Sequence, residues 1–170
     1  MTGPEHVTTS ERADLLEALT RQRHLLRLTV RDLTDEQAAR QVIANTPCLG
    51  DLIKTIINVE QTWLNFILAG VEGMIVGGRK GESQQFQPLE GDTLAGLLFR
   101  YSQVAARTDQ IVSTLTDLDA PRPLPDAPWI EPGTNWSARR VILEVIVETS
   151  RSAARADIVR VSVDNAYSVG

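Results

Sequence analysis

Apolar residues recur at every third or fourth position along four long stretches of this chain, and this pattern constrains its fold more than any other feature. Such spacing places side chains on one side of an α-helix, whereas a half-buried strand requires strict alternation. We therefore predict an all-α protein: a four-helix bundle with a short extra helix and long crossover loops, forming one domain over residues 1–170.

The first two predicted helices have clear boundary signals. A long helix covers about Glu11 to Asp32, with leucine and valine side chains recurring at helical spacing. Thr34 and Gln37 then form a capping box, which predicts a short helix that ends near Arg40.

The next two predicted helices also have boundary signals: a glycine follows the first, and an aspartate caps the second. A second long helix covers Leu49 to Leu68 and is expected to stop at Gly70. The glycine-containing stretch 70–91 predicts a long connection, and such connections often cover a binding site or move. Asp92 is the expected cap of a third long helix, Thr93 to Leu115.

The segment Pro121 to Trp136 contains too many prolines for a helix and lacks strand alternation, so we predict an irregular loop. Ser137 is the expected cap of the fourth long helix, which reaches about Val163. No exposed heptad seam is evident in the sequence, so the pattern alone does not predict a coiled-coil dimer.

The composition of the chain argues against some classes of binding partner and indicates a cellular compartment. A net charge of -5 and a pI near 5.1 argue against a nucleic-acid partner, which normally demands a basic surface. No apolar run approaches the ~20 residues that span a bilayer, so no membrane partner is expected. The single cysteine, Cys48, cannot form an internal disulfide, which favours a reducing cytoplasm.

Several stretches resemble the DinB-like superfamily, specifically its actinobacterial branch of mini-circle or uncharacterised DinB-like proteins. They are LLEALTRQRHLLRLTVRDLTDEQAAR, CLGDLIKTIINVEQTWLNFIL, GDTLAGLLFRYSQVAARTDQIV, DLDAPRPLPDAPWIEPGTNWSARRVIL and ETSRSAARADIVRVSVDNA, and together they cover most of the chain. The resemblance implies a four-helix bundle whose relatives include metal-dependent transferases and isomerases that use a thiol such as mycothiol or bacillithiol. It also makes a homodimer plausible.

The resemblance implies three metal-ligand positions, but this sequence departs from the family pattern at two of them. The histidine position of the second long helix is Thr55, and the two positions of the last helix are Glu148 and Ser152. Further family histidines in that helix correspond to Glu144 and Arg155. Zinc prefers nitrogen and sulfur ligands, usually three from the protein. We therefore expect no metal and no other cofactor.

The polar stripe on the last helix has two possible explanations. In one, Glu148 and its neighbours on the stripe form local ion pairs on a helix that has lost its metal. In the other, the pocket persists and recognises a small organic molecule, because ionisable groups that face a bundle interior are costly unless paired or used. Both explanations remain open from the sequence.

The second explanation predicts a specific site and chemistry. Glu148 and Glu144 would act as acid or base, and Arg155 would stabilise developing negative charge. The residues expected to bind the substrate are Thr55, Asn58, Thr62, Trp63, Arg151 and Ser152, with Phe66, Trp129 and Trp136 as possible walls. The predicted function is metal-independent isomerisation or cyclisation in specialised metabolism. The alternatives are a non-catalytic binding or sequestering protein and, ranked lowest, a thiol-dependent S-transferase.

Two further side chains have reactive chemistry. Cys48 lies just before the second long helix, where a helix N-terminus can lower a thiol pKa, although a packed core thiol is the more ordinary role. His24 is surrounded by arginines on the first helix, and we expect it to be structural.

Overall fold

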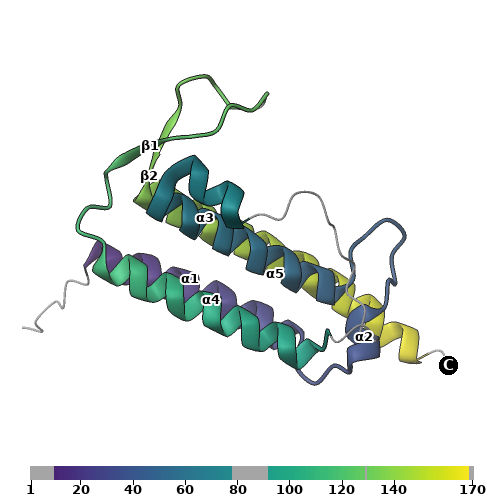
Figure 1. Ribbon diagram of the computed structural model, residues 1–170. Helices are drawn as coiled ribbons and strands as arrows, with labels where there is room; N and C mark the ends of the chain where they lie inside the picture. The colour runs from purple at the N-terminus through teal and green to yellow at the C-terminus, as the bar shows by residue number, and fades with distance from the viewer. Residues whose placement is uncertain (1–9, 78–91, 129, 169–170) are drawn as a thin grey trace, which may run out of the picture.

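The computed structural model describes residues 10–77, 92–128 and 130–168 and confirms the predicted all-α bundle (Figure 1). Its helices are α1 (Glu11–Thr29), α2 (Asp35–Ala39), α3 (Leu49–Gly77), α4 (Leu94–Thr114) and α5 (Ala138–Ser168). None of the described helices is both long and apolar enough to cross a membrane.

The four long helices lie side by side in one bundle (Figure 1), and α1 packs most extensively against α5 and only slightly against α4. Helix α5 packs against both α1 and α3, and α4 packs mainly against α3. Figure 1 shows that α5 runs parallel to α1 and antiparallel to α3. Side-chain hydrogen bonds at both ends fix the α1–α5 alignment, because Arg139 donates to Glu11 at one end and Thr29 donates to Asp157 at the other.

The predicted inward faces fill the space between the helices. One part of the core gathers around the fully buried Leu26, Ile53, Leu97 and Tyr101. A second part lies toward the start of α5 and includes Phe66, Val112, Val141 and Ile142. The apolar stripes of all four long helices therefore meet inside the bundle, as the helical spacing predicts.

Side-chain caps account for most helix starts. The Thr34 capping box is confirmed, since Thr34 Oγ1 accepts from the Gln37 amide at 3.2 Å and Gln37 Oε1 accepts from the Thr34 amide at 2.8 Å. Ser137 Oγ accepts from the Arg140 amide at 3.2 Å, which confirms the predicted cap of α5.

The predicted cap of α4 is wrong by one residue. Thr93 holds that position, and its hydroxyl accepts from the Gly96 amide at 3.0 Å. Asp92 instead forms ion pairs with Lys54 and Arg100. Aspartate and threonine are both good caps, so the sequence alone did not separate these two neighbours.

The first helical part of α3 ends at Gly70, as the glycine signal predicted, but a second helical part follows it directly. Gly70 adopts φ 65° and ψ −151°, a conformation that interrupts the helix, but helical structure resumes and continues to Gly77. The predicted long connection therefore begins after residue 77, and residues 78–91 lie outside the described part of the chain. The other boundaries are close: α1 ends at Thr29 rather than Asp32, and α5 extends to Ser168 rather than Val163.

The proline-rich segment is not wholly irregular, which corrects the prediction of no strands. Strands β1 (Pro121–Pro123) and β2 (Asn135–Ser137) pair antiparallel, with Arg122 opposite Trp136. Prolines are tolerated here because the ladder has only two strands and both are edge strands. The hairpin places Trp136 beside α3 immediately before α5 begins.

Candidate functional site on helices α3 and α5

The three positions that the resemblance implies as metal ligands, Thr55, Glu148 and Ser152, lie on the packed helices α3 and α5 but do not form a ligand cluster. Thr55 is exposed, and its hydroxyl donates to the Asp51 carbonyl of the same helix at 2.8 Å. Glu148 is half-buried and accepts from Arg151 at 2.7 Å. Ser152 is buried, with 5% of its surface exposed.

This set of donors does not fit a catalytic zinc or nickel ion. Glu148 is the one member with a strong metal-binding side chain, and a guanidinium already pairs with it. Neutral hydroxyls such as those of Thr55 and Ser152 are weak ligands for zinc. Among the described residues, no group of three or more histidine, cysteine, aspartate or glutamate side chains could hold a metal ion.

The best-formed arrangement among the predicted site residues is aromatic. Trp63 stacks on Trp136, with ring centroids 5.1 Å apart and an interplanar angle of 21°. Phe66 meets Trp63 edge to face, at 5.7 Å and 87°. The three rings lie together, and their role as the wall of a site stays a prediction. Trp129 lies outside the described residues.

An ion pair extends this aromatic cluster along α5. The Arg140 guanidinium lies 4.7 Å from the centroid of the Trp136 ring, a cation–π contact. The same guanidinium pairs with Glu144 at 3.3 Å, one turn further along the helix. Glu148 comes after one more turn. Tryptophan rings and two paired carboxylates are thus arranged in succession along one side of α5.

The remaining predicted residues are more exposed than a closed pocket would require. Asn58, Arg151 and Arg155 are exposed, and Thr62 is half-buried. The expectation that the ionisable stripe faces the bundle interior is therefore wrong: the stripe lies on the flank of α5. Helical spacing identifies residues that share a side, but it does not distinguish a flank from a buried face.

The stripe nevertheless lies on the flank that adjoins α3. Helices α3 and α5 are antiparallel, and the Trp63–Trp136 stack sets their alignment. Moving about 12 Å from Trp63 along α3 reaches Thr55, and about 15 Å from the start of α5 reaches Glu148. The two positions therefore lie at similar levels of the bundle, so one small molecule on this side could span them.

The structure makes Cys48 an unsuitable nucleophile. The side chain is 4% exposed, and burial raises the pKa of the thiol to about 11, so the proposed activation by the helix N-terminus does not occur. His24 is exposed on α1, away from the α3–α5 flank.

Sequence reasoning missed a buried polar network at the centre of the bundle. Glu60 of α3 is fully buried, forms an ion pair with Arg23 of α1, and accepts from the Thr108 hydroxyl of α4 at 2.7 Å. Arg23 also donates to Asp109 at 2.7 Å. Burial by itself lowers the pKa of Arg23, but the interactions with Glu60 and Asp109 outweigh it and the net pKa is raised.

Beside this network lies Tyr101, whose buried hydroxyl has no hydrogen-bond partner among the described residues. Thr149 is close to it, but the Thr149 hydroxyl donates to the Val145 carbonyl at 2.7 Å, and we assign no bond between the two hydroxyls. Desolvation and the negative charge of Glu60 raise the pKa of Tyr101. The missed signal was available in the sequence, because Glu60 lies at helical spacing within the apolar stripe of α3.

Comparison with known proteins supplies the family. No curated protein and no solved structure matches the chain. The family model described as "Mycothiol-S-transferase" matches residues 14–165, which include all of α3 and nearly all of α5. The chain therefore belongs to the mycothiol-S-transferase family, within the DinB-like superfamily that its sequence resembles.

Proposed function

We propose that this chain acts on a small organic molecule at the α3–α5 flank by metal-independent acid–base chemistry, with isomerisation or cyclisation in specialised metabolism as the reaction class. The observation that carries the proposal is the succession of the Trp63–Trp136 stack, the Arg140–Glu144 pair and the Glu148–Arg151 pair along one side of α5. The family name suggests that the molecule is a low-molecular-weight thiol or a conjugate of one.

Each part of this succession has a distinct chemical role. The tryptophan rings provide an apolar platform on which an organic molecule can stack. Glu148 is a carboxylate within reach of solvent and of a bound molecule, and in its ionised form it accepts a proton as a general base. Glu144 is a second carboxylate one turn away. Arg155 has no hydrogen-bond or ion-pair partner in the described part of the chain, so it is available to hold a developing negative charge.

Two other functions remain as alternatives. The first is a binding or sequestering protein that uses the same flank without turnover. The second is metal-dependent S-transfer, which the family match favours and the donor set at Thr55 and Ser152 opposes. The single buried cysteine supports our proposal of a cytoplasmic location.

The test begins with native mass spectrometry of the purified chain, to identify any co-purified organic ligand. Mycothiol and its S-conjugates are then assayed as substrates by liquid chromatography and mass spectrometry, with and without added zinc. We expect substrate to be consumed without added zinc. We also expect at least a ~100-fold loss of rate in Glu148→Gln, the usual scale for a missing general base.

A matched control is Glu17→Gln, which removes an exposed carboxylate on α1, away from the flank. Retained turnover in Glu148→Gln would refute the catalytic role, and retained binding without any turnover in the unmodified chain would favour the sequestering protein. Turnover that appears only with zinc would restore metal-dependent S-transfer.

A further inference from the structure

The outer surface of helices α1 and α5 carries an unusual share of the exposed apolar side chains. Among the described residues, eight large hydrophobic side chains are exposed, and two of them, Leu68 and Phe99, lie on α3 and α4. The other six lie on α1 and α5 and define what we call the α1–α5 face: Leu25, Leu28, Leu143, Val147, Ile158 and Val161. Exposed apolar side chains concentrated on one pair of helices are typical of a surface that binds a partner.

The residues on α5 form a continuous seam. Leu143, Val147, Ile158 and Val161 are 40–63% exposed, and the exposed Ser150 and Ala154 complete a spacing of three and four between them. This spacing is typical of a helix that packs against another helix. The seam is not a regular heptad repeat, since Ile158 rather than Asp157 follows Ala154 in it, which agrees with the lack of a heptad seam in the sequence.

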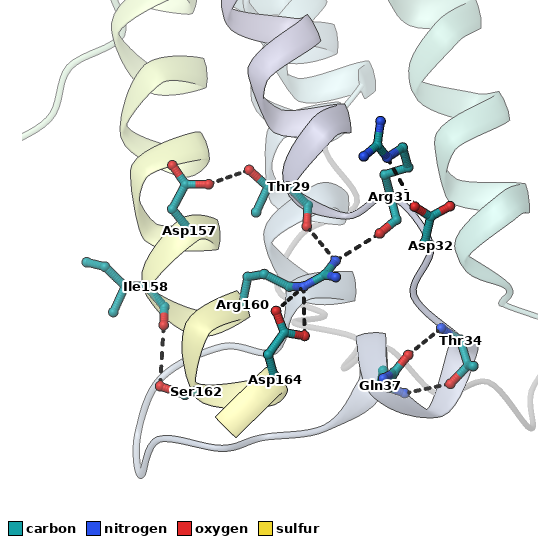
Figure 2. Close-up of polar contacts among 10 residues, drawn as sticks. All are labelled: Thr29, Arg31, Asp32, Thr34, Gln37, Asp157, Ile158, Arg160, Ser162 and Asp164. Carbon is teal, nitrogen blue, oxygen red and sulfur yellow. Dashed lines mark hydrogen bonds and ion pairs between the residues drawn. The ribbon is translucent and has the colours of Figure 1, made fainter. Parts of the chain in front are cut away.

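A shallow groove runs along the same face. It has a volume of about 440 Å³, and its walls include Leu25 and Leu28 of α1 and Ser150, Ala153 and Ala154 of α5. Apart from Asp157, the side chains that α5 contributes to its lining are small. Figure 2 shows the lower part of this face, where Asp157 turns toward Thr29 while Ile158 points away from the other helices.

The seam has an internal symmetry that identifies its partner. Leu143 and Val161 lie nine residues on either side of position 152, and the small Ser150 and Ala154 lie two residues on either side. Val147 and Ile158 lie five and six residues from the same position. If a second copy is rotated by a two-fold axis near position 152, large apolar side chains face large ones and small face small. That is the self-complementary pattern of a two-fold dimer.

The charged residues beside the seam are also ordered along α5, with the acidic ones toward its N-terminus and the basic ones toward its C-terminus. Glu144 and Glu148 precede Arg151 and Arg155 along α5, so reversing the helix brings the acids of one copy beside the arginines of the other. Arg155 has no partner among the described residues, whereas the other arginine, Arg151, already pairs with Glu148. In a parallel dimer the charged flanks of the two copies would instead lie on opposite sides of the interface, too far apart to pair. The charge pattern therefore selects the antiparallel arrangement.

The size of the face is compatible with a stable dimer. From Leu143 to Val161 the seam is about 27 Å long at 1.5 Å per residue, and two adjacent helices are about 20 Å wide. A face of about 27 by 20 Å has a flat area of about 540 Å² per copy, so two copies bury just over the ~1,000 Å² in total that a specific interface needs.

We propose that the chain forms a two-fold homodimer through the α1–α5 face, with α5 antiparallel to α5 of the second copy and Glu148 of each copy paired with Arg155 of the other. The second copy covers the seam and leaves the tryptophan stack of each chain outside the central contact. Arg155 of the second copy lies beside Glu148 at the edge of the α3–α5 flank, so in the dimer the guanidinium next to the proposed base comes from the other chain. This proposal concerns assembly, and its test measures mass, so its outcome is independent of any catalytic activity.

The first test is the mass of the full chain, measured by sedimentation equilibrium between about 1 and 100 µM, where mass action reveals a concentration-dependent dimer. We expect two chains per particle at the upper end. Ile158→Glu should weaken the dimer at least tenfold, because it places a charge in the seam. Phe99→Glu is the matched control, since Phe99 is also 63% exposed but lies on α4. Circular dichroism checks that both variants keep their helicity.

The second test exchanges the charges. Arg155→Glu should weaken the dimer by about tenfold, because the acid of one copy then meets Glu148 of the other. The double variant Glu148→Arg with Arg155→Glu should restore it, because the pair is re-formed in the opposite sense. A single-chain mass at every concentration, or equal dissociation by Phe99→Glu and Ile158→Glu, would overturn the interface. A double variant no stronger than Arg155→Glu would overturn the antiparallel arrangement.

Discussion

At the scale of single residues, the strongest constraints come from polar groups inside the bundle. Glu60 is completely buried and is stabilised by Arg23 and Thr108, so three helices are joined through one carboxylate. A buried ion pair adds little net stability compared with apolar packing, but the removal of one partner leaves a buried charge. The network therefore specifies how α1, α3 and α4 align.

The first residue-scale prediction concerns this network. Glu60→Gln should lower the free energy of unfolding by about 3–5 kcal/mol, because the buried Arg23 loses its main counter-charge. Chemical denaturation followed by circular dichroism measures the change. Asp109→Asn is the control, since the Asp109 side chain is 42% exposed and water can replace it at Arg23. Equal effects of the two substitutions would contradict the central position of Glu60.

For Tyr101, in contrast to Glu60, we expect that removing the polar group does not destabilise the fold. Its ring fills the core, but its buried hydroxyl makes no hydrogen bond with a described residue. Tyr101→Phe keeps the ring and removes the unpaired hydroxyl, so we expect the free energy of unfolding to stay equal or to rise by up to about 1 kcal/mol. A clear loss of stability in a denaturant titration would mean that the hydroxyl has a partner.

The buried thiol predicts a pH dependence. Burial raises the pKa of Cys48 from 9.0 to about 11, so the folded chain holds the thiol proton more tightly than the unfolded chain does. The corresponding stability is present below pH 9 and should decline as pH rises from about 9 to 11. Cys48→Ser should reduce this decline. In the native chain, alkylation of Cys48 at about pH 8 should be slow, and it should accelerate on unfolding.

At the scale of elements, the helices were largely predictable and the interruptions were not. The Thr34 and Ser137 caps and the apolar faces follow from local patterns, because each is decided within one or two helical turns. Gly70 has the same local signature as a helix end, yet helical structure resumes after it. Whether a helix resumes after a glycine depends on how the next segment packs, and a sequence window does not contain that information.

Gly70 and Gly73 allow helical structure to resume after the interruption in α3. Gly70 has the positive φ that L-residues avoid, and a Cβ on Gly73 would lie 2.3 Å from the Asn65 carbonyl oxygen. Gly70→Ala should therefore destabilise the fold by about 1–3 kcal/mol, although open space surrounds the position. Thermal unfolding would detect the change. Gly96→Ala, inside the first turn of α4, is the comparison, and an equal loss there would contradict a special role for the Gly70 backbone.

The candidate site was only partly predictable, for a related reason. The family positions Thr55, Glu148 and Ser152 can be located from the sequence because each lies within a recognisable stretch. The exposure of Arg155, the Arg140–Trp136 contact and the seam on α5 all depend on which side of the helix faces a neighbour. A helix with apolar residues on both its inner and its outer side gives an ambiguous pattern.

At the scale of the whole molecule, the chain has a helical bundle, and the positions that the resemblance implies as metal ligands hold Thr55, Glu148 and Ser152. The fold is held by apolar stripes and by the Arg23–Glu60 network, none of which requires a metal. The proposed chemistry and the proposed assembly both use α5, with the site on its α3 side and the dimer seam on its outer side. Glu148 and Arg155 lie where these two sides meet, so substitutions there should affect both turnover and mass, whereas Ile158→Glu acts first on mass.

The measurement that tests the central claim most directly is the metal content of chain purified without chelator and then incubated with zinc or nickel. Elemental analysis after gel filtration should find well below one equivalent of metal per chain, and Glu148→Gln should not change that value, because Thr55 and Ser152 supply no strong ligands. One equivalent of zinc or nickel per chain, lost in Glu148→Gln, would contradict the account and return this chain to metal-dependent thiol transfer.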